Sequence, residues 1–290
     1  MSKRNFLNFA LAAAAALTIG AVQASTVTIS NGSITARIND AGTFAEYYSD
    51  SAGSPSGSPG LSYLGVEYVN YGTPLSWYTL RSSAGINDAS LGANPFGATT
   101  YAVGTQATTT LGFGGLTFMQ TAVLTAANVL SVTVNIANYT GRAMSNVLWG
   151  VGFDPDQGIA LGGGFATDNT ILGQGSNAAV RASYNGHSVT LRNTTGAAAN
   201  AITAYIDPLN CCAVVDPAAA ISAAQAVGTN ILGDSSISLA YDLGTLGHGQ
   251  SVTVGYEYVF AVPEPGTYGM LLAGLALIGV MVRRRTAAVS

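Results

Sequence analysis

Residues 130–136, Leu-Ser-Val-Thr-Val-Asn-Ile, alternate strictly between apolar and polar side chains. Because successive side chains of a β-strand point to opposite faces of the sheet, this alternation predicts a strand with one buried face. The same pattern recurs in residues 147–153, 237–243 and 252–260. Further strands are expected near residues 75–80, 105–111, 116–124, 189–191 and 202–206.

Turn signals separate these runs. Asn31-Gly32 lies between the apolar runs 27–29 and 34–38 and predicts a two-residue hairpin turn. One helix is expected at residues 217–227, with Asp216 as its N-cap. About a dozen strands with one buried face predict an all-β protein, a single large antiparallel β-sandwich over residues 25–261.

The charge of this block argues against one class of partner. Residues 25–261 contain five arginines, no lysine and thirteen acidic residues, so their net charge is −8. Proteins that bind nucleic acid or anionic lipid need clustered basic residues. We therefore expect no nucleic-acid partner.

Residues 1–24 have the parts of a secretory signal peptide. Lys3 and Arg4 give a positively charged start, residues 6–22 are apolar and rich in Ala and Leu, and small residues precede Ser25. We expect a signal helix here that signal peptidase removes by cleavage between Ala24 and Ser25. The alternative is an uncleaved N-terminal anchor.

The other end, residues 262–290, combines three elements. Val262-Pro263-Glu264-Pro265 comes first, the uncharged residues 266–282 follow, and Arg283, Arg284 and Arg285 come next. As a helix, the uncharged stretch would be about 25 Å long, at the short limit for crossing about 30 Å of hydrocarbon. Because arginines stay on the cytoplasmic side, we expect a transmembrane helix at 266–282 with the sandwich outside the inner membrane.

This tail resembles the PEP-CTERM sorting domain of Gram-negative bacteria that make exopolysaccharide. The resemblance implies recognition by exosortase, a membrane enzyme expected to cleave near Pro263-Glu264-Pro265 and to release or re-anchor the protein at the cell surface or in the extracellular matrix. The alternative is a permanent single-helix anchor. The resemblance covers only the tail and implies nothing about the function of the sandwich.

Cys211 and Cys212 are adjacent and are the only two cysteines. In an oxidising compartment they could form a vicinal disulfide, although neighbouring Cα atoms, about 3.8 Å apart, are closer than in ordinary disulfides. A free or intermolecular pair is the alternative.

Asp154 and Asp156 form the candidate metal site. They lie in a turn after a predicted strand, and calcium prefers clustered carboxylate oxygens. The spacing of an EF-hand loop is absent, and Asp-Pro also starts turns for local reasons. No cofactor is expected, with calcium at this pair as the open alternative.

No catalytic motif appears in the sequence. His187 and His248 lie in glycine-containing turns and are expected to be solvated. Any two carboxylates could form a glycosidase pair, and sequence spacing selects none of the candidates Glu46, Glu67, Asp154, Asp156 and Glu257.

We therefore expect an exported, non-enzymatic surface or matrix protein whose sandwich is structural or binds polysaccharide. The alternative is a carbohydrate-active enzyme on the same fold. A cleft holding two carboxylates about 5–10 Å apart would favour the enzyme. A flat, charge-poor surface would favour the structural or binding role.

Overall fold

The computed structural model describes residues 26–44, 60–69, 76–90, 97–196 and 199–263. Within these ranges the chain forms eighteen strands, two short α-helices and one 3₁₀ helix. The strands are β1 (Val27–Ser30), β2 (Ile34–Ile38), β3 (Leu61–Tyr63), β4 (Val66–Glu67), β5 (Ser76–Ser82), β6 (Gly85–Ser90), β7 (Thr99–Val103), β8 (Gln106–Phe113), β9 (Leu116–Ala126), β10 (Val129–Asn138), β11 (Met144–Phe153), β12 (Thr167–Gly173), β13 (Ala179–Tyr184), β14 (His187–Asn193), β15 (Ala201–Ile206), β16 (Asn230–Gly233), β17 (Ile237–Leu246) and β18 (Ser251–Ala261). The helices are α1 (Gln157–Ala160), α2 (Pro217–Ser222) and the 3₁₀ helix η1 (Gly175–Asn177).

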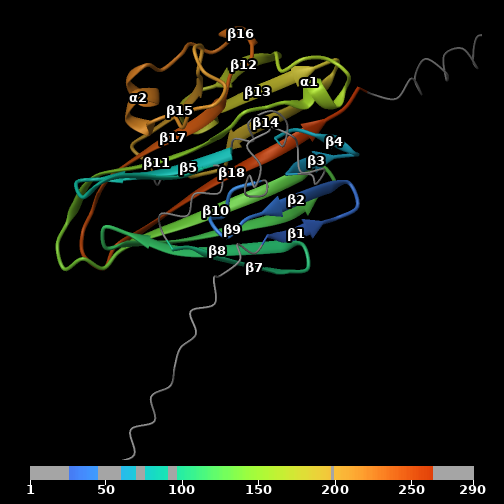
Figure 1. Ribbon diagram of the computed structural model, residues 1–290. Helices are drawn as coiled ribbons and strands as arrows, with labels where there is room; N and C mark the ends of the chain where they lie inside the picture. Colours follow the sequence, from blue (N-terminus) through green and yellow to red (C-terminus); the bar gives the residue numbers. More distant parts are fainter. Residues whose placement is uncertain (1–25, 45–59, 70–75, 91–96, 197–198, 264–290) are drawn as a thin grey trace, which may run out of the picture.

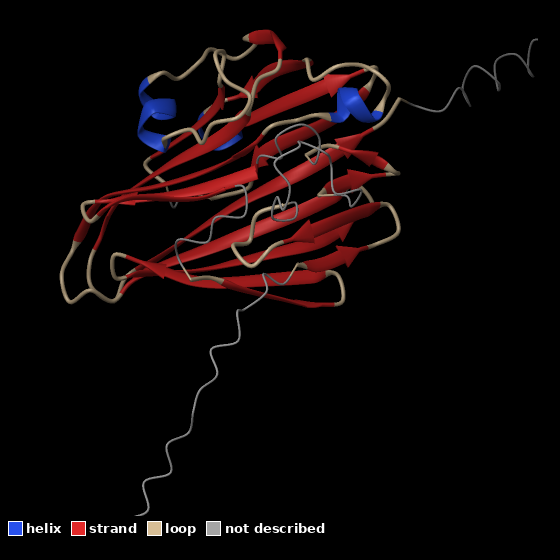
Figure 2. Cartoon of the chain, in the orientation of Figure 1, coloured by secondary structure: helices blue, strands red, loops and turns tan. Residues whose placement is uncertain are grey.

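The strands form three antiparallel sheets. The largest has nine strands in the order β16-β12-β13-β14-β18-β10-β9-β8-β7, and Figure 1 shows it running from β16 at the top to β7 at the bottom. A five-stranded sheet has the order β15-β17-β11-β5-β6, and a four-stranded sheet has the order β1-β2-β3-β4. Figure 2 shows how little helix accompanies these strands.

Aromatic contacts join the sheets face to face. Phe118 of β9 meets Trp149 of β11, with ring centroids 5.1 Å apart, and Tyr258 of β18 meets Phe153 of β11 at 5.5 Å. Tyr63 of β3 stacks on Phe260 of β18 at 5.3 Å. One hydrophobic core therefore lies between the nine-stranded sheet and the two smaller sheets, as in a β-sandwich.

Helix α2 covers part of the outer face of the five-stranded sheet. Ala220 of α2 and Trp77 of β5 belong to a second, small apolar cluster there. The indole of Trp77 lies directly over Gly152 of β11, where a Cβ atom would overlap the ring. Gly152 is thus required by close packing.

These observations confirm the all-β class. The structure has more strands than the dozen expected. Several of them, such as β6 and β12, are rich in polar residues and lack the alternation of apolar and polar side chains on which the prediction depended. The expected signal helix at 1–24 and transmembrane helix at 266–282 lie outside the described residues. No helix in the described ranges is long and apolar enough to cross a membrane.

Two local predictions need correction. The first hairpin is present, but the Asn31 N–H donates to the carbonyl of Ile34, so Gly32-Ser33 rather than Asn31-Gly32 occupies the tip. The reason is that Asn31 Oδ1 accepts the N–H groups of Ser33 and Ile34 and so forms an Asx-turn.

The second correction concerns the helix. Asp216 caps α2 as expected, since its Oδ1 accepts the N–H of Ala218 at 2.9 Å. The helix nevertheless ends at Ser222 instead of residue 227. Gln225 is bound to both backbone groups of Ile206 in β15, and this pairing takes the chain out of the helical path.

Candidate functional site

Three carboxylates meet where two strands end. Asp154 directly follows β11, Asp156 occupies the N-cap position of α1, and Asp234 directly follows β16. One carboxylate oxygen from each of the three lies within 4.8 Å of the others. We call these three residues the acidic cluster.

Two of these carboxylates are buried without full hydrogen bonding. Asp154 is 3% and Asp156 is 1% exposed, whereas Asp234 is exposed. Among the described residues, Oδ1 of Asp154 and both carboxylate oxygens of Asp156 have no hydrogen-bond partner. The backbone of Asp156, in contrast, is hydrogen-bonded: its N–H donates to the carbonyl of Tyr68 at 2.8 Å. Buried polar atoms in native proteins are nearly always bonded, so these oxygens call for a partner.

Burial raises the pKa values of all three groups, and repulsion from neighbouring carboxylates adds to the effect for Asp154 and Asp156. For Asp156 the largest cause is desolvation, followed by the nearby charges of Asp154, Asp234 and Glu67. For Asp154 it is again desolvation, followed by the charge of Asp234. Desolvation also raises the pKa of Asp234. The cluster therefore favours either added protons or a bound cation.

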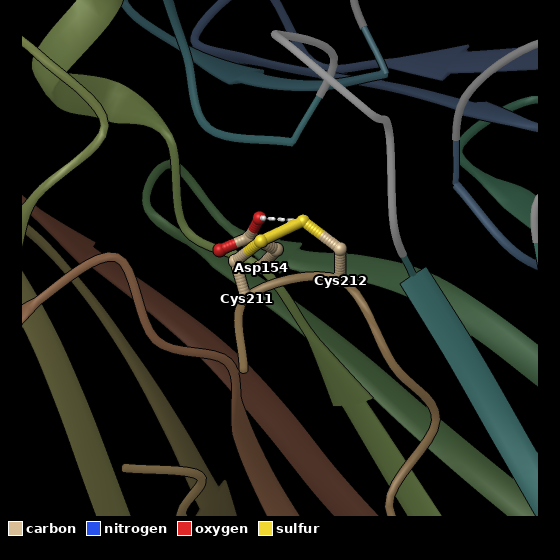
Figure 3. A group of neighbouring side chains, drawn as sticks. All are labelled: Asp154, Cys211 and Cys212. Atoms are coloured by element: carbon tan, nitrogen blue, oxygen red, sulfur yellow. Dashed lines mark hydrogen bonds between the residues drawn. A yellow bond between two sulfur atoms is a disulfide. The ribbon is translucent and has the colours of Figure 1, made fainter. Parts of the chain in front are cut away.

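The cysteine pair lies beside this cluster. Cys211 and Cys212 are joined by a disulfide, with their Cα atoms 3.7 Å apart, in the loop between β15 and α2. In Figure 3 the Oδ2 atom of Asp154 points at the Sγ atom of Cys212, 3.9 Å away. A disulfide sulfur carries no proton, so in this contact only a protonated Asp154 could act as donor. Disulfide sulfurs are also not thiolates, which leaves the cation-binding capacity with the carboxylates.

Two of the other acidic candidates, Glu67 and Glu257, make contacts that hold strands together. Glu67 Oε1 accepts the N–H groups of Leu61 and Val69, both at 3.0 Å, and so holds the β3–β4 region together. Glu257 lies in β18 and pairs with Arg192 of β14. Glu46 lies outside the described residues.

The histidines differ from each other. His248 is exposed in a turn, as expected, and its Nδ1 accepts the N–H of Gly141 at 3.1 Å. His187 corrects the prediction of a solvated loop residue. It begins β14, it is only partly exposed, and its Nδ1 is buried without a hydrogen-bond partner in the described chain. His187 lies in the strand because it pairs with Tyr184 of β13.

Of the expected processing residues, the structure describes only Pro263. It is exposed, two residues beyond the end of β18, and its ring lies against Gly186 in the turn between β13 and β14. Ala24, Ser25, Glu264, Pro265, Arg283, Arg284 and Arg285 lie outside the described residues.

A cavity in the core is too small for a sugar. It holds about 10 Å³ and is lined by residues that include Gln120, Tyr256 and Tyr258. That volume suits one water molecule, whereas small-molecule sites enclose roughly 300 Å³ or more.

Sequence reasoning found Asp154 and Asp156 but not Asp234. The first two are neighbours in one turn, and their proximity could be read locally. Asp234 reaches them only because β16 pairs with β12 across the sheet. No local pattern around Gly233-Asp234-Ser235 signals this meeting.

These features define an all-β protein of sandwich type with an acidic cluster of two buried aspartates and one exposed aspartate. Its tail, residues 261–285, matches the model of the PEP-CTERM protein-sorting motif, which confirms the resemblance found in the sequence. This motif indicates export, processing by exosortase, and a cell-surface or extracellular destination in bacteria. No curated protein matches the chain.

Some solved structures resemble the chain weakly. A candidate aldose 1-epimerase from Escherichia coli K12 has a TM-score of 0.47 at 13% identity, covering 83% of this chain and all of that one. A polysaccharide lyase has a TM-score of 0.40 at 13% identity, covering 83% of this chain. The heparan sulfate lyase HepC from Pedobacter heparinus has a TM-score of 0.34 at 10% identity, covering 79% of this chain. The chain spans 33% of the first lyase and 29% of the second. At this level of similarity no likeness identifies a substrate or an activity.

Proposed function

We propose that the mature protein is a non-catalytic component of the cell surface or extracellular matrix whose sandwich, residues 25–261, binds polysaccharide. The surface that would bind is the outer face of strands β7 to β10 with β18, which we call the hydroxyl face. The observation that carries this proposal is the chemistry of that face.

Strands β7, β8, β9 and β10 contain no charged residue, and the one charged residue of β18, Glu257, is paired with Arg192 of β14. Leu130, Val132 and Val134 of β10 point into the core, so Ser131, Thr133 and Asn135 face outward. The strand register places Thr121 beside Thr133, and Asn135 beside Thr253. The exposed side chains of this face include Thr110, Thr117, Thr133 and Thr253 together with the apolar Val103 and Met119.

These side chains suit a neutral, hydroxyl-rich ligand. Each threonine hydroxyl can donate one hydrogen bond and accept two, and an asparagine amide does both, which matches the hydroxyl groups of a sugar chain. Tyr101 of β7, 57% exposed, adds an aromatic face on which a sugar ring could stack. A regular sheet offers such groups in rows, as an extended polymer requires.

The environment of the acidic cluster argues against catalysis. A glycosidase pair needs an open cleft between its two carboxylates. Asp154 and Asp156 are instead almost completely buried. The alternative of a carbohydrate-active enzyme predicts that the protein releases new reducing ends from polysaccharide, and that Asp154→Asn abolishes this release.

The polysaccharide proposal is tested by pull-down with exopolysaccharide of the host. Thr133→Glu places a charge in the centre of the hydroxyl face and should reduce the bound fraction at least several-fold. Thr245→Glu, at an exposed position of β17, makes the same exchange on another sheet and should leave binding intact. Equal binding by both variants and the parent protein would exclude the hydroxyl face.

Processing at the two ends completes the proposal. Signal peptidase cleaves between Ala24 and Ser25, and the tail, residues 262–290, holds the precursor in the inner membrane through the helix at 266–282 and Arg283 to Arg285. Exosortase then acts near Pro263-Glu264-Pro265. The exposure of Pro263 just after β18 supports access by such an enzyme.

Mass spectrometry of surface-extracted protein tests this processing. The mature N-terminus should be Ser25, and peptides beyond residue 282 should be missing in a Gram-negative host with active exosortase. Replacing Pro263, Glu264 and Pro265 by alanine should trap the membrane-anchored form. Dominant peptides that end at Ser290 despite active exosortase would contradict the proposal and favour a permanent anchor.

A further inference from the structure

The acidic cluster has the geometry of a site for one large divalent cation. Calcium binds oxygen atoms at about 2.3–2.6 Å, so two oxygens on one ion lie at most about 5 Å apart. The three carboxylate oxygens of Asp154, Asp156 and Asp234 lie within 4.8 Å of one another and meet this limit.

A second observation, separate from the grouping of acids, points to a ligand. The side chain of Asp156 is 1% exposed and both of its oxygens lack a partner among the described residues. A carboxylate buried in this way costs free energy unless it is neutralised. A cation would satisfy it together with the unpartnered Oδ1 of Asp154.

The exposure of Asp234 makes the site reachable. Because one of the three carboxylates faces solvent, a cation can enter from that side and keep water molecules as its remaining ligands. Calcium takes six to eight oxygen ligands in flexible geometry, whereas magnesium demands a tight octahedron at about 2.0–2.1 Å. Three carboxylates that come from two separate segments of the chain suit the flexible coordination of calcium better than the tight octahedron of magnesium.

We propose that Asp154, Asp156 and Asp234 bind one calcium ion that ties the end of β11 to the end of β16. This site is independent of polysaccharide binding, because the hydroxyl face contains none of its ligands. Extracellular calcium modules bind with dissociation constants of about 10⁻⁴–10⁻³ M, and a three-carboxylate site open to solvent should fall in this range.

Thermal unfolding of the full chain, extracted in detergent, tests the proposal. Relative to EDTA, CaCl₂ at about 10 mM should raise Tm by roughly 3–10 °C, and MgCl₂ at the same concentration should raise it less. Asp234→Asn, at an exposed position that does not endanger folding, should remove most of the calcium effect. Asp88→Asn, a partly exposed position in β6, is the matched control and should keep it.

Asp156→Asn separates ligation from a merely structural role. In EDTA its Tm should exceed that of the parent protein, because a buried carboxyl without a partner among the described residues is gone, yet calcium should no longer raise it. Thr133→Glu should keep the full calcium shift, so failure of the polysaccharide proposal and failure of this one are distinguishable.

Three results would overturn the calcium site. One is a parent protein whose Tm does not respond to calcium. Another is an equal calcium shift in Asp234→Asn and Asp88→Asn. The third is an equal shift with magnesium, which would contradict the choice of ion.

Discussion

Glu257 and Asp156 carry the same chemical group in two opposite environments. On the hydroxyl face, Glu257 Oε2 accepts from Nε and Nη2 of Arg192, at 2.9 and 2.6 Å, and its Oε1 accepts from the hydroxyl of Ser131 at 2.8 Å. In the acidic cluster, Asp156 has neither a cation nor a donor among the described residues, although it is more deeply buried.

The contrast shows where the protein depends on something outside itself. A carboxylate with an arginine beside it contributes to the fold from within the chain. A buried carboxylate surrounded by other acids weakens the fold until protons or a cation neutralise it. The carboxylate on the hydroxyl face is therefore neutralised by the chain itself. The stability of the acidic cluster instead depends on pH and on cations in the solution.

The largest expected effect is on the pH dependence of stability in EDTA. Burial raises the pKa of Asp154 and Asp156 above the ordinary value of 3.8, so between that value and the raised pKa the folded state binds more protons than the unfolded state. The free energy of unfolding should then fall as pH rises through this window, by up to about 1.4 kcal/mol per pH unit for each carboxyl. Below the window this contribution is fully present.

Urea unfolding at a series of pH values from acid to neutral measures this effect. Comparison with Asp156→Asn separates the contribution of the cluster, because the acidic groups that do not interact with Asp156 titrate alike in both proteins. A parent protein whose stability follows pH in parallel with the variant would show that the cluster does not titrate as inferred.

The next largest effect is the change in the free energy of unfolding when a carboxylate is replaced by an amide, which should have opposite signs in the two regions. Asp156→Asn should stabilise the calcium-free protein near neutral pH by about 1–3 kcal/mol, because neutralising the buried group no longer costs free energy. Chemical unfolding in EDTA gives this value directly. A destabilised but folded variant would mean that Asp156 has a partner that satisfies its charge.

Glu257→Gln should act in the opposite direction and more weakly. Arg192 is half exposed, so solvent screens the pair and its loss should cost about 0.2–1 kcal/mol. Added salt should reduce the difference between the parent protein and the variant. A cost that does not change with salt would indicate that packing, not charge, holds Glu257 in place.

The fold and the cluster differ in how much of them could be read from the sequence. Strict alternation in residues 130–136 identified β10, because the residues on its buried face are apolar and those on its other face are polar. Strand β12, Thr167–Gly173, was not predicted because its buried residues include the polar Thr167 and Asn169, whose burial the sequence does not indicate. Local pattern therefore predicts strands with apolar inner faces and misses those buried by tertiary contact.

The same limit applies to the cluster. Asp154 and Asp156 were visible as a pair in one turn, but neither their burial nor the arrival of Asp234 is encoded locally. Both follow from the pairing of β16 with β12 and from the contact between Asp156 and Tyr68. Pairing between strands that are distant in sequence therefore decides whether two aspartates of a turn stay isolated or become part of a cluster.

The smallest expected effect concerns the disulfide between Cys211 and Cys212. A disulfide stabilises mainly by restricting the unfolded chain, and the restriction grows with the loop that it closes. Here the bonded residues are sequence neighbours, so almost no loop is closed. Reduction should therefore lower Tm by about 1 °C or less, which corresponds to about 0.5 kcal/mol or less, whereas disulfides typically contribute about 2–4 kcal/mol.

Intact mass and alkylation establish the bond in protein purified without reductant. Reduction should add the mass of two hydrogens, and two thiols should then become reactive. Thermal unfolding of the oxidised and reduced forms in EDTA gives the stability difference. Two alkylatable thiols before reduction would contradict the bond itself. A large drop in Tm after reduction would instead mean that the loop between β15 and α2 supports the acidic cluster through the 3.9 Å contact of Cys212 with Asp154. The stability of the cluster would then depend on an oxidising environment as well as on calcium.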